Sequence, residues 1–269
     1  MNIRTSLKLP KEHGAWAMLY VPFVLGAIVG GDFGLPIVLL LLAVTALFIA
    51  RESLLVWWRA HNRRRTTDNA RQAGRLLLFY GAIAVTSGIP LLLVYRLYWL
   101  LPLALLGCIL LAVNGKQATE FADRSVASEV MAIIGLTMTA PAAYLAARGQ
   151  NAAVTLWLWA LSAAYFASSV FYVKLRVTGL HAKRPEDKQR ARWQCVGYHA
   201  FLLLSLLALA VTRSLPLFAL IAFAPVLART TWSLFKPTET LNLKHIGLSE
   251  IAYALIFLLF TTLTFRLAT

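Results

Sequence analysis

Long apolar stretches, separated by polar segments, recur along the whole chain. A helix needs about 20 mostly apolar residues to cross a bilayer. Nine stretches approach this length, and several end early at a charged residue, so we expect the helices to continue beyond them. The stretches are Ala15–Val29, Leu35–Ala50, Leu76–Tyr95, Leu97–Val113, Val130–Ala147, Ala152–Val173, Tyr198–Thr212, Leu215–Leu227 and Ile251–Phe265. We therefore predict an all-α fold, a polytopic membrane bundle of nine transmembrane helices that forms one integral membrane domain over residues 1–269.

The composition excludes the main soluble classes. Apolar residues make up 59% of the 269 residues, and charged residues only 14%. A soluble globular chain carries roughly 25% charged residues, and a disordered chain is poor in apolar ones. The two cysteines, Cys108 and Cys195, are far apart and form neither a disulfide framework nor a zinc-binding motif.

The basic residues predict the orientation in the membrane. With the N-terminus in the cytoplasm, 22 of the 26 Lys and Arg residues fall on the cytoplasmic side, as the positive-inside rule requires. The four exceptions are Arg96, Arg148, Arg213 and Arg266. We expect the C-terminus outside, and we read the net charge of +15 as a topology signal that also attracts anionic lipid, with no nucleic-acid partner.

Ten of the eleven acidic residues fall on the same predicted side, Asp32 being the exception. The connections there are long, whereas the outer ones are short turns. We therefore expect a binding site at the cytoplasmic side, and we assign no catalytic residue and no metal ligand. The candidate binding residues are Glu12, His13, Trp16, Glu52, Arg59, Arg63, Glu129, Lys174, Arg176, Lys244, His245 and Glu250.

Each group of candidates also has a structural interpretation. Ser128 and Ser249 precede Glu129 and Glu250, and both pairs suit a helix N-terminus with a capping Ser and a first-turn Glu. Arg51 or Arg59 could neutralise Glu52. The run of arginines from Arg63 is typical of a solvated positive-inside segment.

Several segments resemble the YwiC-like family of bacterial membrane proteins. They are Pro10–Leu19 with Pro22, Ser128-Glu129, the basic exit from the sixth stretch, and Lys244–Ile251. The resemblance implies a multi-pass protein of the bacterial cytoplasmic (inner) membrane. It implies no particular activity.

The chain also resembles, more distantly, the UbiA superfamily of intramembrane prenyltransferases. That likeness rests on nine helices, the same orientation and long cytoplasmic connections, and it implies a cavity open to the cytoplasm. The acidic magnesium-binding motifs of that superfamily are missing, since Val56 and Ala60 stand at the expected Asp spacings and residues 172–176 are basic. We therefore predict no cofactor.

Our leading hypothesis is a UbiA-like protein that binds an isoprenoid or anionic lipid, with Lys174, Arg176 and the arginines of residues 59–65 replacing the metal. If it is an enzyme, it is a prenyltransferase-like transferase with an altered site. The alternatives are a transporter or channel for a small anion, and a non-catalytic membrane scaffold subunit. The expected partner is membrane lipid, and no protein partner is assigned.

Overall fold

The computed structural model describes residues 13–62, 68–120, 126–215, 218–235 and 243–267. These residues form ten α-helices and contain no β-strand, which confirms the all-α prediction. The helices are α1 (His13–Gly30), α2 (Leu35–Asn62), α3 (Asp68–Leu93), α4 (Leu100–Glu120), α5 (Val126–Thr137), α6 (Thr139–Ala146), α7 (Ala152–His181), α8 (Pro185–Val211), α9 (Phe218–Phe235) and α10 (Leu243–Leu267).

Seven of the helical segments are long and apolar enough to cross a membrane, judged by length and composition. In that assignment α5 and α6 count together, from Ser128 to Ala146, and the shorter apolar helices Gly14–Gly30 and Leu100–Val113 are set apart. Many large apolar side chains face outward, such as Leu78 and Val211, which are 76% and 83% exposed. An apolar outer surface of this kind suits lipid as solvent. The chain is a multi-pass membrane protein, and nine crossings stay a prediction.

The nine predicted stretches largely coincide with helices, and the expected extension is present. The helix α2 continues to Asn62, and α8 already begins at Pro185. The stretch Val130–Ala147 differs because it contains both α5 and α6, which are separated at Met138. Proline inside α1, α3 and α9 does not end those helices.

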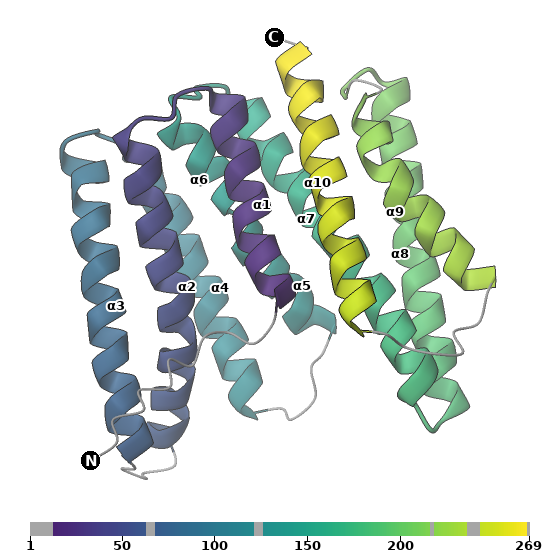
Figure 1. Cartoon of the computed structure of the whole chain (residues 1–269), viewed down its shortest axis with the longest axis horizontal. Helices are drawn as coiled ribbons and strands as arrows, with labels where there is room; N and C mark the ends of the chain where they lie inside the picture. The colour runs from purple at the N-terminus through teal and green to yellow at the C-terminus, as the bar shows by residue number, and fades with distance from the viewer. Residues whose placement is uncertain (1–12, 63–67, 121–125, 216–217, 236–242, 268–269) are drawn as a thin grey trace.

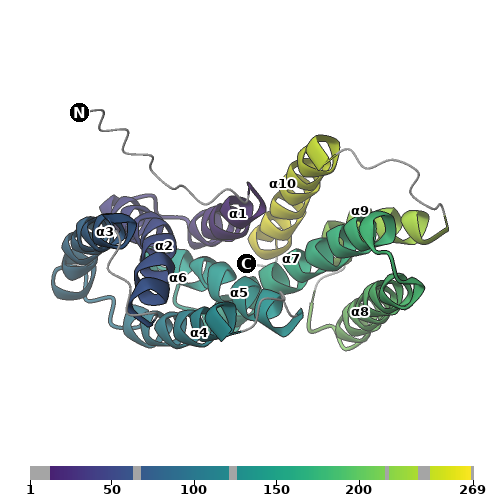
Figure 2. The same ribbon diagram turned by 90° about the horizontal axis from the view of Figure 1, so that it is seen from below.

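The helices stand side by side and alternate in direction (Figure 1). Seen end on, α2 and α3 form one edge of the bundle and α8 the other, with α7 between them (Figure 2). The closest packing joins α2 with α3, α1 with α6, α7 with α8, and α9 with α10. We call the end at which α1, α5 and α10 begin and α2 and α7 end the basic end, and the other the turn end.

Two apolar cores lie side by side in the bundle. The larger core joins α1 and α5 to α10 around Tyr165, Phe223 and Phe257. Their rings pack against each other, with the Tyr165 and Phe257 centroids 4.3 Å apart. The smaller core joins α1, α2 and α6, with Leu91 of α3 and Leu100 of α4, and includes Phe23 and Leu40. The helices α1 and α6 contribute to both cores and therefore hold the two halves of the bundle together.

The contact between α1 and α6 depends on small residues. A Cβ atom at Gly26 would collide with the Ala140 carbonyl, and one at Gly30 would collide with Ala147. Glycines four residues apart let two backbones approach closely, which is the usual way in which membrane helices pack. The hydroxyl of Thr139 donates to the Leu19 carbonyl at 2.7 Å in the same interface.

The turn end accounts for the four basic residues that the predicted orientation leaves outside. Arg96, Arg148 and Arg213 adopt left-handed backbone conformations, with φ of 55°, 62° and 56°, in the turns that follow α3, α6 and α8. Arg266 donates to the Ile28 carbonyl at 2.7 Å, in the last turn of α1. Basic side chains near helix C-termini are electrostatically favourable. These arginines therefore have structural roles, which the positive-inside rule does not consider.

Neither serine predicted as a helix cap lies at the start of its helix. Ser249 does not begin a helix, because α10 already starts at Leu243, and its hydroxyl donates to the Ile246 carbonyl at 2.8 Å. Glu250 therefore lies in the third turn of α10 and not beside the helix N-terminus. Ser128 lies two residues after the start of α5, and Glu129 is in its first turn as expected.

Candidate functional site

A cavity of about 860 Å³ lies near the basic end of the bundle. Its lining comes from the first turns of α1, from Arg51 on α2, from residues along α5, from the last part of α7 and from the beginning of α10. Five helices that are far apart in the sequence therefore meet around one space. Its size is typical of pockets that hold small ligands.

The walls of the cavity are mostly apolar. Met18 from α1, Leu136 from α5 and Phe166 from α7 contribute large side chains. The apolar walls of the cavity continue into the larger core, because Ile133 and Phe166 belong both to the cavity lining and to that core. A cavity of this composition favours an apolar or amphipathic occupant.

Within the described part of the chain, four charged residues line the cavity: Arg51, Glu129, Lys174 and Glu250. Lys174 Nζ lies 3.1 Å from Glu129 Oε2, and both side chains are about a quarter exposed, at 27% and 26%. Arg51 Nη1 lies 3.2 Å from Oε1 of the adjacent Glu52, which confirms the expected partner of Glu52. These pairs leave part of their charge accessible at the mouth of the cavity.

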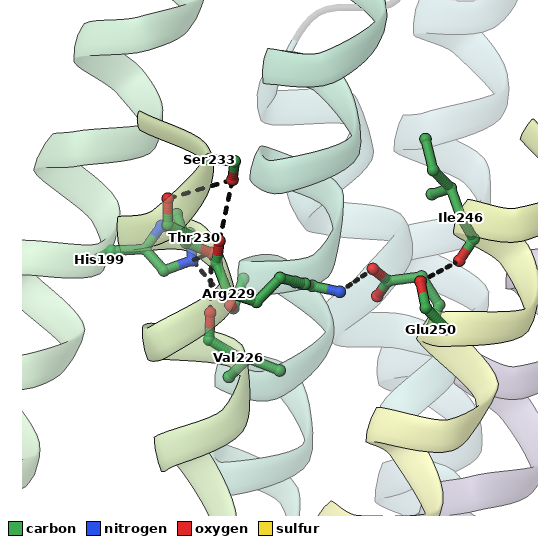
Figure 3. A network of polar contacts seen from close by, with 9 residues as sticks. His199, Val226, Arg229, Thr230, Ser233, Ile246 and Glu250 are labelled. Carbon is green, nitrogen blue, oxygen red and sulfur yellow. Dashed lines mark hydrogen bonds and ion pairs between the residues drawn. The ribbon is translucent and has the colours of Figure 1, made fainter. Parts of the chain in front are cut away.

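The fourth charged residue, Glu250, belongs to a more deeply buried pair. Arg229 extends from α9 to Glu250 on α10, and its Nη1 forms an ion pair with Oε1 (Figure 3). The Arg229 side chain is only 8% exposed. Its guanidinium also lies 3.8 Å from the centre of the Tyr172 ring and 4.8 Å from that of Tyr253. Aromatic faces attract a cation, so the two rings help to hold this charge inside the bundle.

Several buried polar atoms around this pair lack a hydrogen-bond partner among the described residues. They are Glu250 Oε2, Arg229 Nε and Nη2, Ser169 Oγ and Tyr165 Oη. Ser169 is close enough to the Glu250 carboxylate to act on it, and Ser169 also lines the cavity. Buried polar groups in native proteins nearly always have partners. This spot therefore has unused capacity to bind a polar group.

Three of the predicted binding residues meet at the cavity, namely Glu129, Lys174 and Glu250. Trp16, Glu52, Arg59 and Arg176 are not among the described residues that line it. Trp16 packs its ring against Tyr20 and Phe48 instead, and Arg59 is exposed in the last turn of α2. Glu12 and Arg63, and the side chains of His13, Lys244 and His245, lie outside the part of the chain that the structure describes.

Sequence reasoning missed Arg229, Tyr172, Tyr253 and Ser169. We expected the eighth stretch to end at Leu227, which made Arg229 look like a loop charge. In the structure α9 continues to Phe235, so Arg229 lies within the helix. The available signal was a single arginine among apolar and hydroxyl residues, because ionisable residues inside membrane helices are rare and usually paired.

A second buried polar cluster joins α7, α8 and α9 around His199. Its Nδ1 donates to the Cys195 carbonyl at 2.8 Å, and Nε2 lies 2.9 Å from Ser168 Oγ and 3.1 Å from Thr230 Oγ1. Ser168 and Thr230 are fully buried, and the cavity lining includes none of these described side chains. We therefore interpret the cluster as hydrogen bonding that joins helices within the membrane.

No group of three or more His, Cys, Asp or Glu side chains is placed to hold a metal ion in the described ranges. The cations at the mouth of the cavity are those of Lys174 and Arg51. An anionic group would therefore meet guanidinium and ammonium groups at this position.

A comparison with sequence profiles of protein families finds one described as YwiC-like protein, which matches residues 9–144, half of the chain. The matched region covers α1 to α6 and includes Arg51 and Glu129, whereas Lys174, Arg229 and Glu250 follow it. No curated protein and no solved structure matches the chain significantly.

Proposed function

The chain belongs to the YwiC-like family, and we propose that it binds an isoprenoid or anionic lipid in the cavity at its basic end. The tail of the lipid lies against the apolar walls, and its anionic head group lies at the mouth, beside Lys174 and Arg51. The observation that carries the proposal is the combination of these walls with charged side chains from α2, α5, α7 and α10 around one space.

The apolar walls supply the affinity. Because the surrounding lipid is as apolar as these walls, the tail is held there by packing contacts and not by leaving water. A branched isoprenoid tail fits walls built from Met18, Leu136 and Phe166, and it can enter from the surrounding lipid.

The charged mouth supplies the selectivity for an anion. The Lys174–Glu129 pair is partly exposed, and such pairs stabilise a protein by only about 0.2–1 kcal/mol. A phosphate or carboxylate head group can therefore compete with Glu129 for Lys174 at little cost. Arg51 adds a planar guanidinium, which suits phosphate oxygens.

We further propose that the protein lies in the bacterial inner membrane with its N-terminus in the cytoplasm. The distribution of the basic residues supports this orientation, and it places the mouth of the cavity at the cytoplasmic surface. We propose likewise that the helices are arranged around the cavity as in the UbiA superfamily.

Thermal stability of the detergent-purified protein tests lipid binding. A ligand that binds only the native state raises the apparent melting temperature. We expect geranylgeranyl diphosphate to raise it equally with magnesium and with a chelator. The Lys174→Gln variant should lose most of this shift, whereas Lys183→Gln removes the same charge from an exposed position and should keep it.

Two results would contradict the proposal. The absence of a shift in both conditions would remove the lipid site, and a shift seen only with magnesium would remove the metal-free site.

Transport of a small anion is a second candidate, because Arg229 and Glu250 are ionisable residues inside candidate membrane spans. Anion flux into proteoliposomes that is lost in Glu250→Gln would favour transport over lipid binding.

A further inference from the structure

We propose that the cavity recognises a hydrogen-bond-donating group of its ligand, a hydroxyl or an ammonium, at Glu250 and Ser169. This inference rests on the proposed function, because it assigns a second contact to the same ligand. It differs from the proposed anion contact at Lys174 both in position and in chemistry.

The first argument concerns which hydrogen-bonding capacity remains unused. Lys174 and Glu129 pair with each other, and Arg51 pairs with Glu52. In contrast, Glu250 uses one carboxylate oxygen for Arg229, and its Oε2 has no hydrogen-bond partner within the described chain. Of the two acidic side chains that line the cavity, Glu250 is therefore the one with an accepting atom to spare.

The second argument concerns the fixed position of that acceptor. The Glu250 carboxylate is held by Arg229, whose guanidinium is confined between the rings of Tyr172 and Tyr253. An acceptor that is already oriented loses little entropy when a ligand binds. The Glu250–Arg229 pair thus presents a preformed acceptor at the wall of the cavity.

Ser169 provides an independent observation at the same place. Ser169 is 7% exposed and lines the cavity from α7. Its hydroxyl has no hydrogen-bond partner among the described groups. A hydroxyl both donates and accepts. A ligand hydroxyl or ammonium between Ser169 and Glu250 would therefore satisfy two buried groups at once.

The charge of the lining agrees with this assignment. Among the residues that the structure describes, the charged ones in the lining are two cations and two anions. A ligand that carries only negative charge would complement half of them. A polar end with both an anionic and a donating group complements the whole set.

Competition binding to the purified full-length protein tests the inference, with radiolabelled geranylgeranyl diphosphate as the probe. The competitors are geranylgeraniol and its methyl ether, which share a tail and differ in the donated hydrogen. A hydrogen bond to a charged group is worth roughly 1.5–3 kcal/mol, so we expect the alcohol to compete at least about tenfold better. Geranylgeranylamine and its N-trimethyl analogue form the second pair and separate an ammonium donor from a hydroxyl donor.

Variants test whether Ser169 and Glu250 cause the preference for a hydrogen-bond donor. Ser169→Ala should reduce the ratio of alcohol to ether affinity toward one without disturbing the ion pair. Ser162→Ala is the matched control, because Ser162 is another buried, unpartnered serine on α7 and is not among the described lining residues. Glu250→Gln should weaken the amine more than the alcohol, since it removes the charge but keeps an accepting oxygen.

The outcomes separate the two proposals. Equal affinity of the alcohol and the ether for the wild-type protein, with the probe bound, would overturn the inference and leave lipid binding in place. Equal effects of Ser169→Ala and Ser162→Ala would also overturn it. If the probe does not bind at all, the proposed function fails, and the inference fails with it.

Discussion

Arg229 shows most clearly how single residues are constrained in this bundle. It carries the charge of a helix that has no other charged residue, and its side chain is 8% exposed. The ion pair with Glu250 and the two tyrosine rings offset the cost of removing that charge from water. Removing one member of such a pair leaves the other charge buried and uncompensated.

We predict that Arg229→Leu and Glu250→Leu each destabilise the protein by about 3 kcal/mol, whereas the double variant loses less than the two single variants together. Melting temperatures in one detergent measure this. Lys174→Met and Glu129→Met are the matched comparison and should each cost about 1 kcal/mol or less, since that pair is partly exposed. Additive losses at Arg229 and Glu250 would contradict a coupled pair.

At this scale the sequence predicted the polar residues better than their contacts. Glu129, Lys174 and Glu250 could be selected because each stands beside an apolar stretch on the predicted cytoplasmic side. Their partners could not be identified, because an ion pair between α9 and α10 depends on how far each helix extends. The helix α10 begins at Leu243, and this start changes Glu250 from a first-turn residue into an inner one.

At the scale of elements, the contact between α1 and α6 has the least room for change. Gly26 lies against the backbone of Ala140, so that even one added methyl group requires the helices to separate. Helix packing at this distance requires small side chains, and the hydrogen bond from Thr139 to the Leu19 carbonyl adds to it.

Gly26→Ala should therefore destabilise the protein, by about 1–3 kcal/mol for overpacking. Gly107→Ala is the matched control in α4, because a Cβ atom there would meet nothing within 4 Å. Alanine is the better helix former, so this variant should be as stable as the wild type or slightly more so. If the melting temperatures of both variants change in the same direction relative to the wild type, the close packing at Gly26 is contradicted.

The helices themselves were largely predictable, because apolar segments in lipid must satisfy their backbone groups internally. Their ends were not. Polar residues extend α2 to Asn62 and α8 back to Pro185, beyond the ends of the apolar stretches. The start of α8 does carry helix N-terminal signals, a proline followed by Glu186 and Asp187, but hydropathy does not detect them. The break between α5 and α6 at Met138 has a signal in Pro141, which cannot donate to the Thr137 carbonyl and so interrupts the helix there.

On the scale of the whole molecule, the two ends of the bundle differ in character. The basic end carries the cavity and its charged lining, and the turn end carries short connections in which Arg148 pairs with Asp32 at 2.8 Å. This asymmetry agrees with a protein that faces two different compartments. The meeting of α1, α2, α5, α7 and α10 around one cavity could not be predicted, because it depends on packing between segments far apart in the chain.

Fusions of alkaline phosphatase, which is active only outside the cytoplasm, test the orientation in a bacterial host. We predict high activity for a fusion after Thr269 and low activity for a fusion after His181, at the basic end. A fusion after Gly149 should be active, since that turn lies at the opposite end. Activity at His181 with none at Gly149 would invert the proposed orientation.

The most direct test of the account is whether lipid occupies the cavity of the protein as purified. Native mass spectrometry of wild type, Ala132→Trp and Ala104→Trp measures this, because Ala132 lines the cavity and Ala104 is exposed on α4. We predict that a lipid of defined mass remains bound to the wild type and to Ala104→Trp, and that Ala132→Trp loses it while keeping its melting temperature in lipid-free detergent. The same lipid retained by a folded Ala132→Trp would show that it binds elsewhere and would contradict the cavity as the binding site.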